Sequence, residues 1–209
     1  MRNTGTEIKK RAAIAPADQR EQAGDAQYLG DIDAQLMFRI AAGDREAEAA
    51  LVRRNATVVA RYIARVLRDE HIREDVVQDV LMRAIAAAPR YRATAKFSTW
   101  LYRIATNVAL RHLEKSNKSQ TNTEQEVFQN LPTSGQNPES TVTRDELRQH
   151  VGRALGALPP NQRIPLTLFQ YEGLSYQQIA DVMDLSVESI RALLKRARES
   201  LRKNLREFT

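Results

Sequence analysis

The 209-residue sequence contains no cysteine, and this absence excludes disulfide bonds, cysteine-ligated zinc and thiol catalysis. Its three histidines, His71, His112 and His150, are far apart, and none has a metal-ligand spacing. No apolar run approaches the roughly 18 to 20 residues that a membrane-spanning helix needs. The apolar stretch at 12–17 is too short for the core of a signal peptide. We therefore expect no metal, no cofactor and no direct membrane insertion, and we expect the chain to remain in the compartment where it is made.

Apolar residues recur at helical spacing through most of the chain, and we find no strand-like segments. Asp33 is the expected cap of a first short helix that Gly43 ends, and Asp44 is the expected cap of the next helix. Ser98 is expected to cap a later helix that runs toward Leu113. The predicted helices are 34–42, 45–67, 73–87, 99–113, 145–158 and 161–171, with Pro159 and Pro160 interrupting before the last and Pro165 distorting it. The predicted fold class is therefore all-α.

Composition divides the chain into two small helical domains. Residues 116–143 include 17 Ser, Thr, Asn or Gln residues among 28, which predicts a flexible polar linker. Residues 1–30 lack hydrophobic periodicity, which predicts a disordered or loosely structured extension. The predicted division is an extension at 1–30, a domain at 31–114, a linker at 115–143 and a second domain at 144–209.

The stretch at 174–205 predicts two helices joined by a tight turn. Ser175 followed by Gln178 has the spacing of a capping box at the start of the first helix. Asp184 fits the turn because Asp tolerates a left-handed backbone better than most non-glycine residues. Ser186 can then cap the second helix. The apolar stripe of that helix consists of Ile190, Leu193, Leu194, Ala197 and Leu201.

A separate stripe of the second helix is basic. Residues 191–206 include seven basic residues and one acid, Glu199. A short capped helix, a tight turn and a cationic second helix are what a helix-turn-helix reader of the DNA major groove requires. The alternative is a surface hairpin whose charges are merely solvated, although such hairpins rarely concentrate one sign of charge so strongly. Four of the basic residues recur at i, i+4, i+7 and i+11: Arg191, Lys195, Arg198 and Arg202.

A second basic block lies at 90–118, with a net charge of +6, and residues 119–149 carry −3 before a block of +3 at 150–209. A polyanion bound at two places is the simplest partner for this pattern. In the loop at 90–97, cations alternate with Tyr91 and Phe97, and Arg103, Asn107 and Arg111 follow as an i, i+4, i+8 row. Aromatic rings stack on unpaired bases, so the loop and the following helix resemble a single-strand platform. For Trp100 alone, a packed core aromatic is the better interpretation.

The helix at 73–87 carries acidic residues beside its apolar stripe. Asp75 and Asp79 are like charges at i, i+4, an arrangement that is mildly unfavourable in an isolated helix. A cationic partner at that face would account for the pair. For Glu74 and Asp75, a favourable interaction with the helix dipole is an equally good explanation.

Three motifs resemble bacterial extracytoplasmic-function (ECF) sigma factors: EDVVQDVLMRAI at 74–85, KFSTWLYRIATNVALRHL at 96–113 and LPPNQRIPLTLFQYEGLSYQQIADVMDLSVESIRALLKRARESL at 158–201. The resemblance covers about residues 32–205 in the right order, and it departs from the family pattern at Pro160, Pro165 and Asp184. It implies a bacterial cytoplasmic protein that binds core RNA polymerase and directs it to promoters. It also implies control by an anti-sigma factor.

The resemblance assigns three sets of binding residues. A polymerase-binding face would consist of Glu74, Asp75, Gln78 and Asp79. The non-template single strand of the minus-ten element would contact Tyr91, Lys96, Phe97, Trp100, Arg103, Asn107 and Arg111. In the minus-thirty-five duplex, Arg191, Lys195 and Arg196 would lie nearest the bases, with Arg198, Arg202, Ser175 and Tyr176 on the backbone.

Two other functions would also use a helix-turn-helix unit. A free-standing helix-turn-helix regulator would bind duplex DNA alone as a dimer. Its first domain would not need a second basic surface with aromatic residues, such as the one at 90–118. A recombination enzyme would need a Ser or Tyr nucleophile within an arginine cluster, or three metal-binding carboxylates on a mixed fold. We find no such group, no glycine-rich phosphate loop and no convincing acid–base pair. We therefore expect no catalytic residues and a protein that is not an enzyme.

Overall fold

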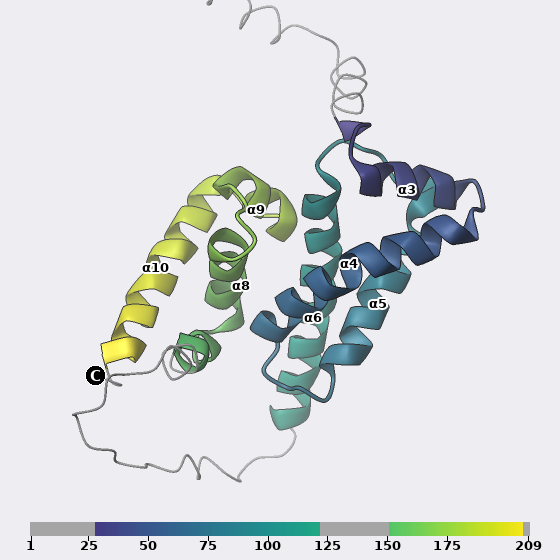
Figure 1. The fold of residues 1–209 in the computed structure, drawn as a ribbon. Coiled ribbons are helices and arrows are strands. Elements are labelled where there is room, and N and C mark those ends of the chain that lie inside the picture. The colour runs from purple at the N-terminus through teal and green to yellow at the C-terminus, as the bar shows by residue number, and fades with distance from the viewer. Residues whose placement is uncertain (1–27, 122–150, 207–209) are drawn as a thin grey trace, which may run out of the picture.

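The computed structural model describes residues 28–121 and 151–206. All regular elements in this part of the chain are helices, which confirms the all-α prediction (Figure 1). The predictions made for the first 27 residues and for most of the linker lie outside the described residues. No helix in the described part is both long and apolar enough to span a bilayer.

The first half of the molecule is a bundle in which α4 packs against α3 and α5, and α5 packs against α6. Its longest helices cross in Figure 1, with α6 near the centre of the molecule. Buried side chains from all of these helices join one apolar core. The bounds are α3 Ile32–Ala41, α4 Arg45–Val66, α5 Arg73–Ala86, η1 Ala88–Arg90 and α6 Phe97–Thr121.

The caps of the first helices differ from the prediction at one position. Asp31, not Asp33, caps α3, because its carboxylate accepts a hydrogen bond from the Asp33 amide at 3.0 Å. Asp33 instead forms an ion pair with Arg54, with 2.6 Å between Oδ1 and Nε. Asp44 caps α4 as predicted, after Gly43 turns the chain with φ of 90°.

Helix α6 begins earlier and ends later than the prediction. Phe97 is its first residue, so Ser98 lies inside the first turn and is not the cap. The helix continues to Thr121, beyond the predicted start of the linker at residue 115. The helix therefore extends into a segment whose composition resembles a linker.

The second half contains a helical stretch at 151–156 followed by α8 Pro160–Gln170, α9 Tyr176–Met183 and α10 Val187–Arg206. The chain is not helical at 157–159, so the predicted interruption is confirmed at Pro159, whereas Pro160 occupies the first turn of α8, where a missing amide hydrogen costs little. The helix continues through Pro165 to its end at Gln170. Helices α8, α9 and α10 pack on one another.

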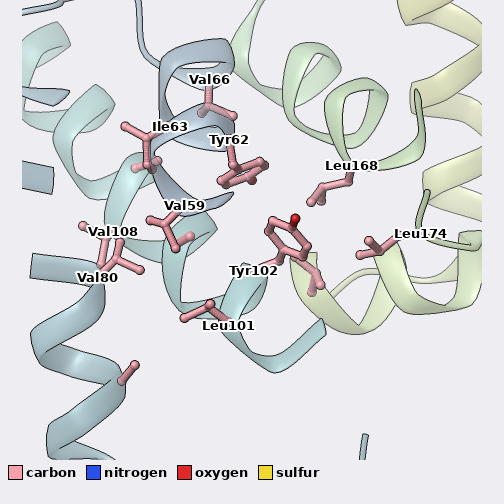
Figure 2. Close-up of a cluster of buried hydrophobic side chains, with 14 of the residues drawn as sticks. Val59, Tyr62, Ile63, Val66, Val80, Leu101, Tyr102, Val108, Leu168 and Leu174 are labelled. Carbon is pink, nitrogen blue, oxygen red and sulfur yellow. The ribbon is translucent and has the colours of Figure 1, made fainter. Parts of the chain in front are cut away.

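The two halves share a continuous buried core. Helix α6 packs on α9 and α8, and α4 packs on α8. In Figure 2, Tyr62 and Tyr102 of the first half lie beside Leu168 and Leu174 of the second. All four of these side chains are at least 94% buried.

Candidate nucleic-acid interface

The turn between α9 and α10 has the predicted geometry. The Ser175 hydroxyl accepts from the Gln178 amide at 3.2 Å, and the Gln178 side chain accepts from the Ser175 amide at 2.8 Å. Asp184 then adopts the left-handed conformation, with φ of 55° and ψ of 47°. Ser186 caps α10 by accepting from the Ser189 amide at 3.1 Å. These local contacts fix the direction in which α10 leaves the turn.

Helix α10 buries one stripe and leaves its cations in solvent. Ile190, Leu194 and Ala197 are fully buried against α8 and α9. In Figure 1, α10 lies on the side of the second half that faces away from α4 and α5. The predicted DNA-binding cations are all exposed: Arg191, Lys195, Arg196, Arg198 and Arg202.

Two of these cations have contacts that limit where they point. Arg191 lies 4.0 Å from Glu188, an exposed ion pair that is easily broken. Arg198 donates to the Tyr176 hydroxyl at 3.3 Å and stacks over the Phe169 ring at 5.4 Å from its centroid. Tyr176 is half-buried and Ser175 is exposed. The predicted phosphate contacts Arg198, Tyr176 and Ser175 therefore lie close together at the junction of α9 and α10.

The aromatics of the loop before α6 form a cluster rather than an open platform. Phe97 is 1% exposed and Tyr91 is 7% exposed, so neither ring is available to stack on a base in this structure. The Tyr91 ring lies edge-on to Trp100 at 4.9 Å, and Phe38 of α3 packs against Tyr91 at 5.7 Å. Burial, with nearby Asp31, raises the pKa of Tyr91 to about 12. Trp100 is half-buried and is the most accessible ring of the predicted set.

Asp31 connects α3 to the start of α6, a role that its place in the sequence does not predict. Its second carboxylate oxygen accepts a hydrogen bond from the Phe97 amide at 3.2 Å. The same side chain caps α3, so it joins the end of the loop at 91–97 to the start of α3. The two partners are 66 residues apart, and no local pattern signals such a contact.

The remaining cations of the first half form an exposed strip. Arg103, Asn107 and Arg111 are exposed on α6, as is Lys96 before it. Their row follows one face of the helix, as the i, i+4, i+8 spacing predicts. Arg103 Nη2 lies 3.9 Å from Asp184 Oδ1, which connects this row to the turn between α9 and α10.

The acidic face of α5 is largely exposed. Glu74, Asp75 and Gln78 are exposed, whereas Asp79 is half-buried and pairs with Arg83 at 2.7 Å. Met82, which we did not predict as a binding residue, has 64% of its surface exposed on the same helix. The exposed surface of α5 therefore combines acidic side chains with one apolar side chain.

No group of three His, Asp or Glu side chains in the described part of the chain is arranged to hold a metal ion. The buried polar groups there belong to the core. Arg163 is 2% exposed, and its Nη1 donates to the Gly156 carbonyl at 3.0 Å. Burial and the nearby Arg68 lower its pKa to about 10.

Comparison with known proteins assigns each half to a described unit. The family model of Sigma-70 region 2 matches residues 51–119, and that of Sigma-70 region 4 matches residues 148–201. The ECF RNA polymerase sigma-E factor of Escherichia coli K12 is 34% identical over 176 residues, which is 81% of this chain and 92% of that protein. The RNA polymerase sigma-H factor of Pseudomonas aeruginosa is also 34% identical, over 83% of this chain and 93% of that protein.

Solved structures agree with this result. CnrH, in complex with the cytosolic domain of CnrY, matches 86% of this chain and 100% of its own, with a TM-score of 0.62 and 26% identity. The sigma factor RpoE of Bartonella quintana, in complex with the anti-sigma factor NepR, has the same fold at 21% identity and a TM-score of 0.58. The RpoE match covers 74% of this chain and 94% of that one.

Proposed function

This chain belongs to the ECF sigma factors of bacterial RNA polymerase. We propose that it uses three separate surfaces: one binds the polymerase, and the other two bind the two promoter elements. Sigma factors are transcription initiation factors rather than catalysts. An alternative sigma factor of this kind binds core RNA polymerase and directs it to a particular set of promoters. In this chain we assign region 2 to residues 31–114 and region 4 to 144–209, with a linker at 115–143.

The proposed minus-thirty-five reader is α10. A recognition helix places its N-terminal residues against base edges and its later residues near the backbone. Arg191, Lys195 and Arg196 are therefore assigned to the bases, and Arg198 and Arg202 to the phosphates. The exposure of all five side chains supports this assignment.

The proposed minus-ten surface is α6 with the loop before it. Lys96, Arg103, Asn107 and Arg111 are exposed and are assigned to the single strand, with Trp100 as the ring available for stacking. Tyr91 and Phe97 are assigned a structural role instead: both rings are buried and pack beneath the surface of the loop, where they stabilise its conformation. Proteins that bind single-stranded DNA combine charge along the backbone with aromatic stacking of bases, and the exposed cations together with Trp100 supply both.

The proposed polymerase-binding surface is α5, with Glu74, Asp75, Gln78 and Asp79. Exposed acids of this kind fit a basic partner surface, and Met82 would add an apolar contact beside them. We also propose that a protein partner controls access to these surfaces, as an anti-sigma factor would. This part of the proposal is supported by CnrH, which was solved with the cytosolic domain of CnrY.

We further propose that the chain catalyses no reaction itself and acts in the bacterial cytoplasm, where core RNA polymerase works. The observation that carries the whole proposal is that two exposed basic surfaces lie on separate halves, each matching a sigma-70 region. A free-standing helix-turn-helix regulator would not account for the match to region 2.

The test is capture of purified core RNA polymerase by the full chain, with Asp75→Lys and Asp79→Lys combined in one variant. Glu70→Lys is the matched control, because Glu70 has 80% of its side chain exposed and precedes α5. We expect the wild type and the control to bind core enzyme, and the double variant to lose at least tenfold in affinity, or about 1.4 kcal/mol. Equal binding by all three proteins would reject the assignment of α5.

A further inference from the structure

Helix α10 begins with an acidic side chain, ahead of the cations that are assigned to the minus-thirty-five duplex. Glu188 is the second residue of this helix, and 78% of its side chain is exposed. Its Oε1 lies 4.0 Å from Nη1 of Arg191, which follows one turn later on the same side of the helix. The carboxylate therefore lies beside the residue that is placed nearest the bases.

The start of α10 does not depend on Glu188. The Ser186 hydroxyl caps the helix by accepting a hydrogen bond from the Ser189 amide at 3.1 Å. An exposed acid gains little from the helix dipole, and an exposed ion pair adds little to stability. A carboxylate on a DNA-facing helix also repels phosphates, so it weakens the binding of DNA of every sequence. The fold thus gives no strong reason for an acid at this position, and general DNA binding opposes one.

The other polar side chains at the start of α10 are committed to its cap. The Ser186 and Ser189 hydroxyls lie 3.0 Å apart and form a hydrogen bond with each other. Ala192 is exposed one turn after Glu188, but its side chain has no polar atom. Within residues 186–192, Glu188 and Arg191 are therefore the side chains whose hydrogen-bonding groups are available to base edges.

These two side chains suit different bases. An ionised carboxylate accepts hydrogen bonds and donates none. In the major groove, the amino donors are cytosine N4 and adenine N6, and the adenine donor lies beside the N7 acceptor, which suits the amide of Asn or Gln. A carboxylate therefore selects cytosine, whereas a guanidinium donates to O6 and N7 of guanine.

The spacing of Glu188 and Arg191 fits neighbouring base pairs. Residues three apart are separated by about 4.5 Å along a helix axis. Successive base pairs are separated by about 3.4 Å. A recognition helix places its N-terminal residues against base edges, and both side chains lie in the first turns of α10, on the outer side of the second half (Figure 1). One helix face can therefore present both side chains to adjacent base pairs.

We propose that Glu188 determines specificity by accepting a hydrogen bond from the N4 amino group of a cytosine, in the base pair next to the guanine that Arg191 contacts. Guanine and thymine present carbonyl oxygens at this edge, and adenine presents N7 beside its amino group. Each of these bases would set an acceptor against the carboxylate, which disfavours the wrong sequences. This inference rests on the proposed assignment of α10 to the minus-thirty-five duplex.

Selection by the full chain from a library of duplexes with a randomised central segment tests the proposal. We expect the wild type to enrich a cytosine beside a guanine. Glu188→Gln should enrich adenine in place of that cytosine, because an amide pairs with N6 and N7 of adenine. Glu188→Ala should keep the guanine and lose the preference at the neighbouring pair. Glu199→Gln is the matched control, because it removes the same charge from an exposed position about three turns later on α10.

Titrations of the selected duplex and its single-pair variants measure the size of the effect. The wild type and Glu199→Gln should bind the cytosine duplex about tenfold more tightly than the adenine duplex, and Glu188→Gln should reverse this order. Both Gln variants should also bind unrelated duplexes more tightly than the wild type does, because each has lost one negative charge. A change in base preference, which charge alone does not produce, therefore distinguishes Glu188 from Glu199.

The outcomes distinguish this inference from the assignment on which it rests. If the wild type and both Glu188 variants enrich the same sequence, Glu188 does not contact a base and the inference is rejected. The same conclusion follows if Glu188→Gln tightens binding to every duplex as Glu199→Gln does, with no change in preference. If the wild type enriches no sequence and Arg191→Ala binds every duplex as the wild type does, the fault lies in the assignment of α10, and the inference is rejected with it.

Discussion

On α10, every predicted DNA-binding cation is exposed, whereas two of the rings predicted to contact the minus-ten strand, Tyr91 and Phe97, are core side chains. Tyr91 and Phe97 are buried because Phe38 of α3 packs against Tyr91 and Trp100 of α6 packs against both rings. Only α8 and α9 pack against α10 in the described part of the chain, so the basic side of α10 remains exposed. Helix α6 lies between α4, α5, α8 and α9, so few of its positions reach solvent.

This comparison separates two kinds of binding surface. An amphipathic helix at the edge of a domain presents its polar stripe whatever the rest of the molecule does. A central helix presents only the positions that its neighbours leave uncovered. On α6 these uncovered positions are Arg103, Asn107 and Arg111, whereas on α10 the whole basic stripe is exposed.

The largest expected effect distinguishes support from contact at the loop. Phe97→Ala removes a ring that is 1% exposed, and we expect a loss of about 3 to 5 kcal/mol in the free energy of unfolding. Lys96→Ala, at the exposed neighbouring position, should change it by less than about 0.5 kcal/mol. Urea denaturation followed by circular dichroism measures both. A loss below about 1 kcal/mol for Phe97→Ala would show that its ring is not a core side chain.

The sequence was sufficient where the controlling contacts are local. The capping box of Ser175 and Gln178 and the left-handed Asp184 each depend on residues within a few positions, and the structure confirms them. The burial of Tyr91 and Phe97 was not predictable in this way. An alternation of cations and rings fits an exposed loop and a loop packed under α3 equally well. Tertiary contacts such as that of Phe38 with Tyr91 decide between them.

The junction between the halves was missed for the same reason. Glu172 and Tyr102, which form a hydrogen bond across this junction, are 70 residues apart, and Asp31 and Phe97 are 66 apart. Neither pair has a spacing or motif that marks it in the sequence. The cap of α3 was placed two residues late because both Asp31 and Asp33 are good caps, and the ion pair with Arg54 removes Asp33 from that role.

The second prediction concerns the open surface. Arg191→Ala should cost about 1 to 3 kcal/mol in binding to the cognate duplex and relax selectivity at one base pair, if Arg191 makes a bidentate base contact. Arg202→Ala should weaken binding to all duplexes about equally. It should also reduce the slope of log affinity against log salt concentration by about 1, the value for one phosphate contact. Titrations of cognate and altered duplexes at several salt concentrations separate the two effects. Equal losses of selectivity in both variants would refute the division between base and phosphate contacts.

The third prediction tests the support of the loop by Asp31. Asp31→Ser keeps a capping oxygen for α3 but cannot also reach the Phe97 amide, so we expect a cost of about 0.5 to 1.5 kcal/mol. Asp44→Ser is the matched control, since Asp44 caps α4 without contacting the loop. Amide hydrogen exchange by NMR should show faster exchange at Phe97 in Asp31→Ser alone. If both variants leave that amide equally protected, the loop does not depend on Asp31.

The smallest effect is expected where the two surfaces meet. Asp184 and Arg103 are 3.9 Å apart, but their side chains are 92% and 53% exposed, so the pair should contribute less than about 1 kcal/mol. Asp184→Asn removes the charge and keeps a residue that tolerates the left-handed turn, so the free energy of unfolding should change by about 0.5 kcal/mol or less. Asp184→Ala also removes that tolerance and should cost about 1 kcal/mol more. Thermal denaturation of the two variants therefore separates the cost of the left-handed backbone conformation at residue 184 from the energy of the ion pair. If Asn is as costly as Ala, the contact between the turn and α6 is stronger than its exposure allows.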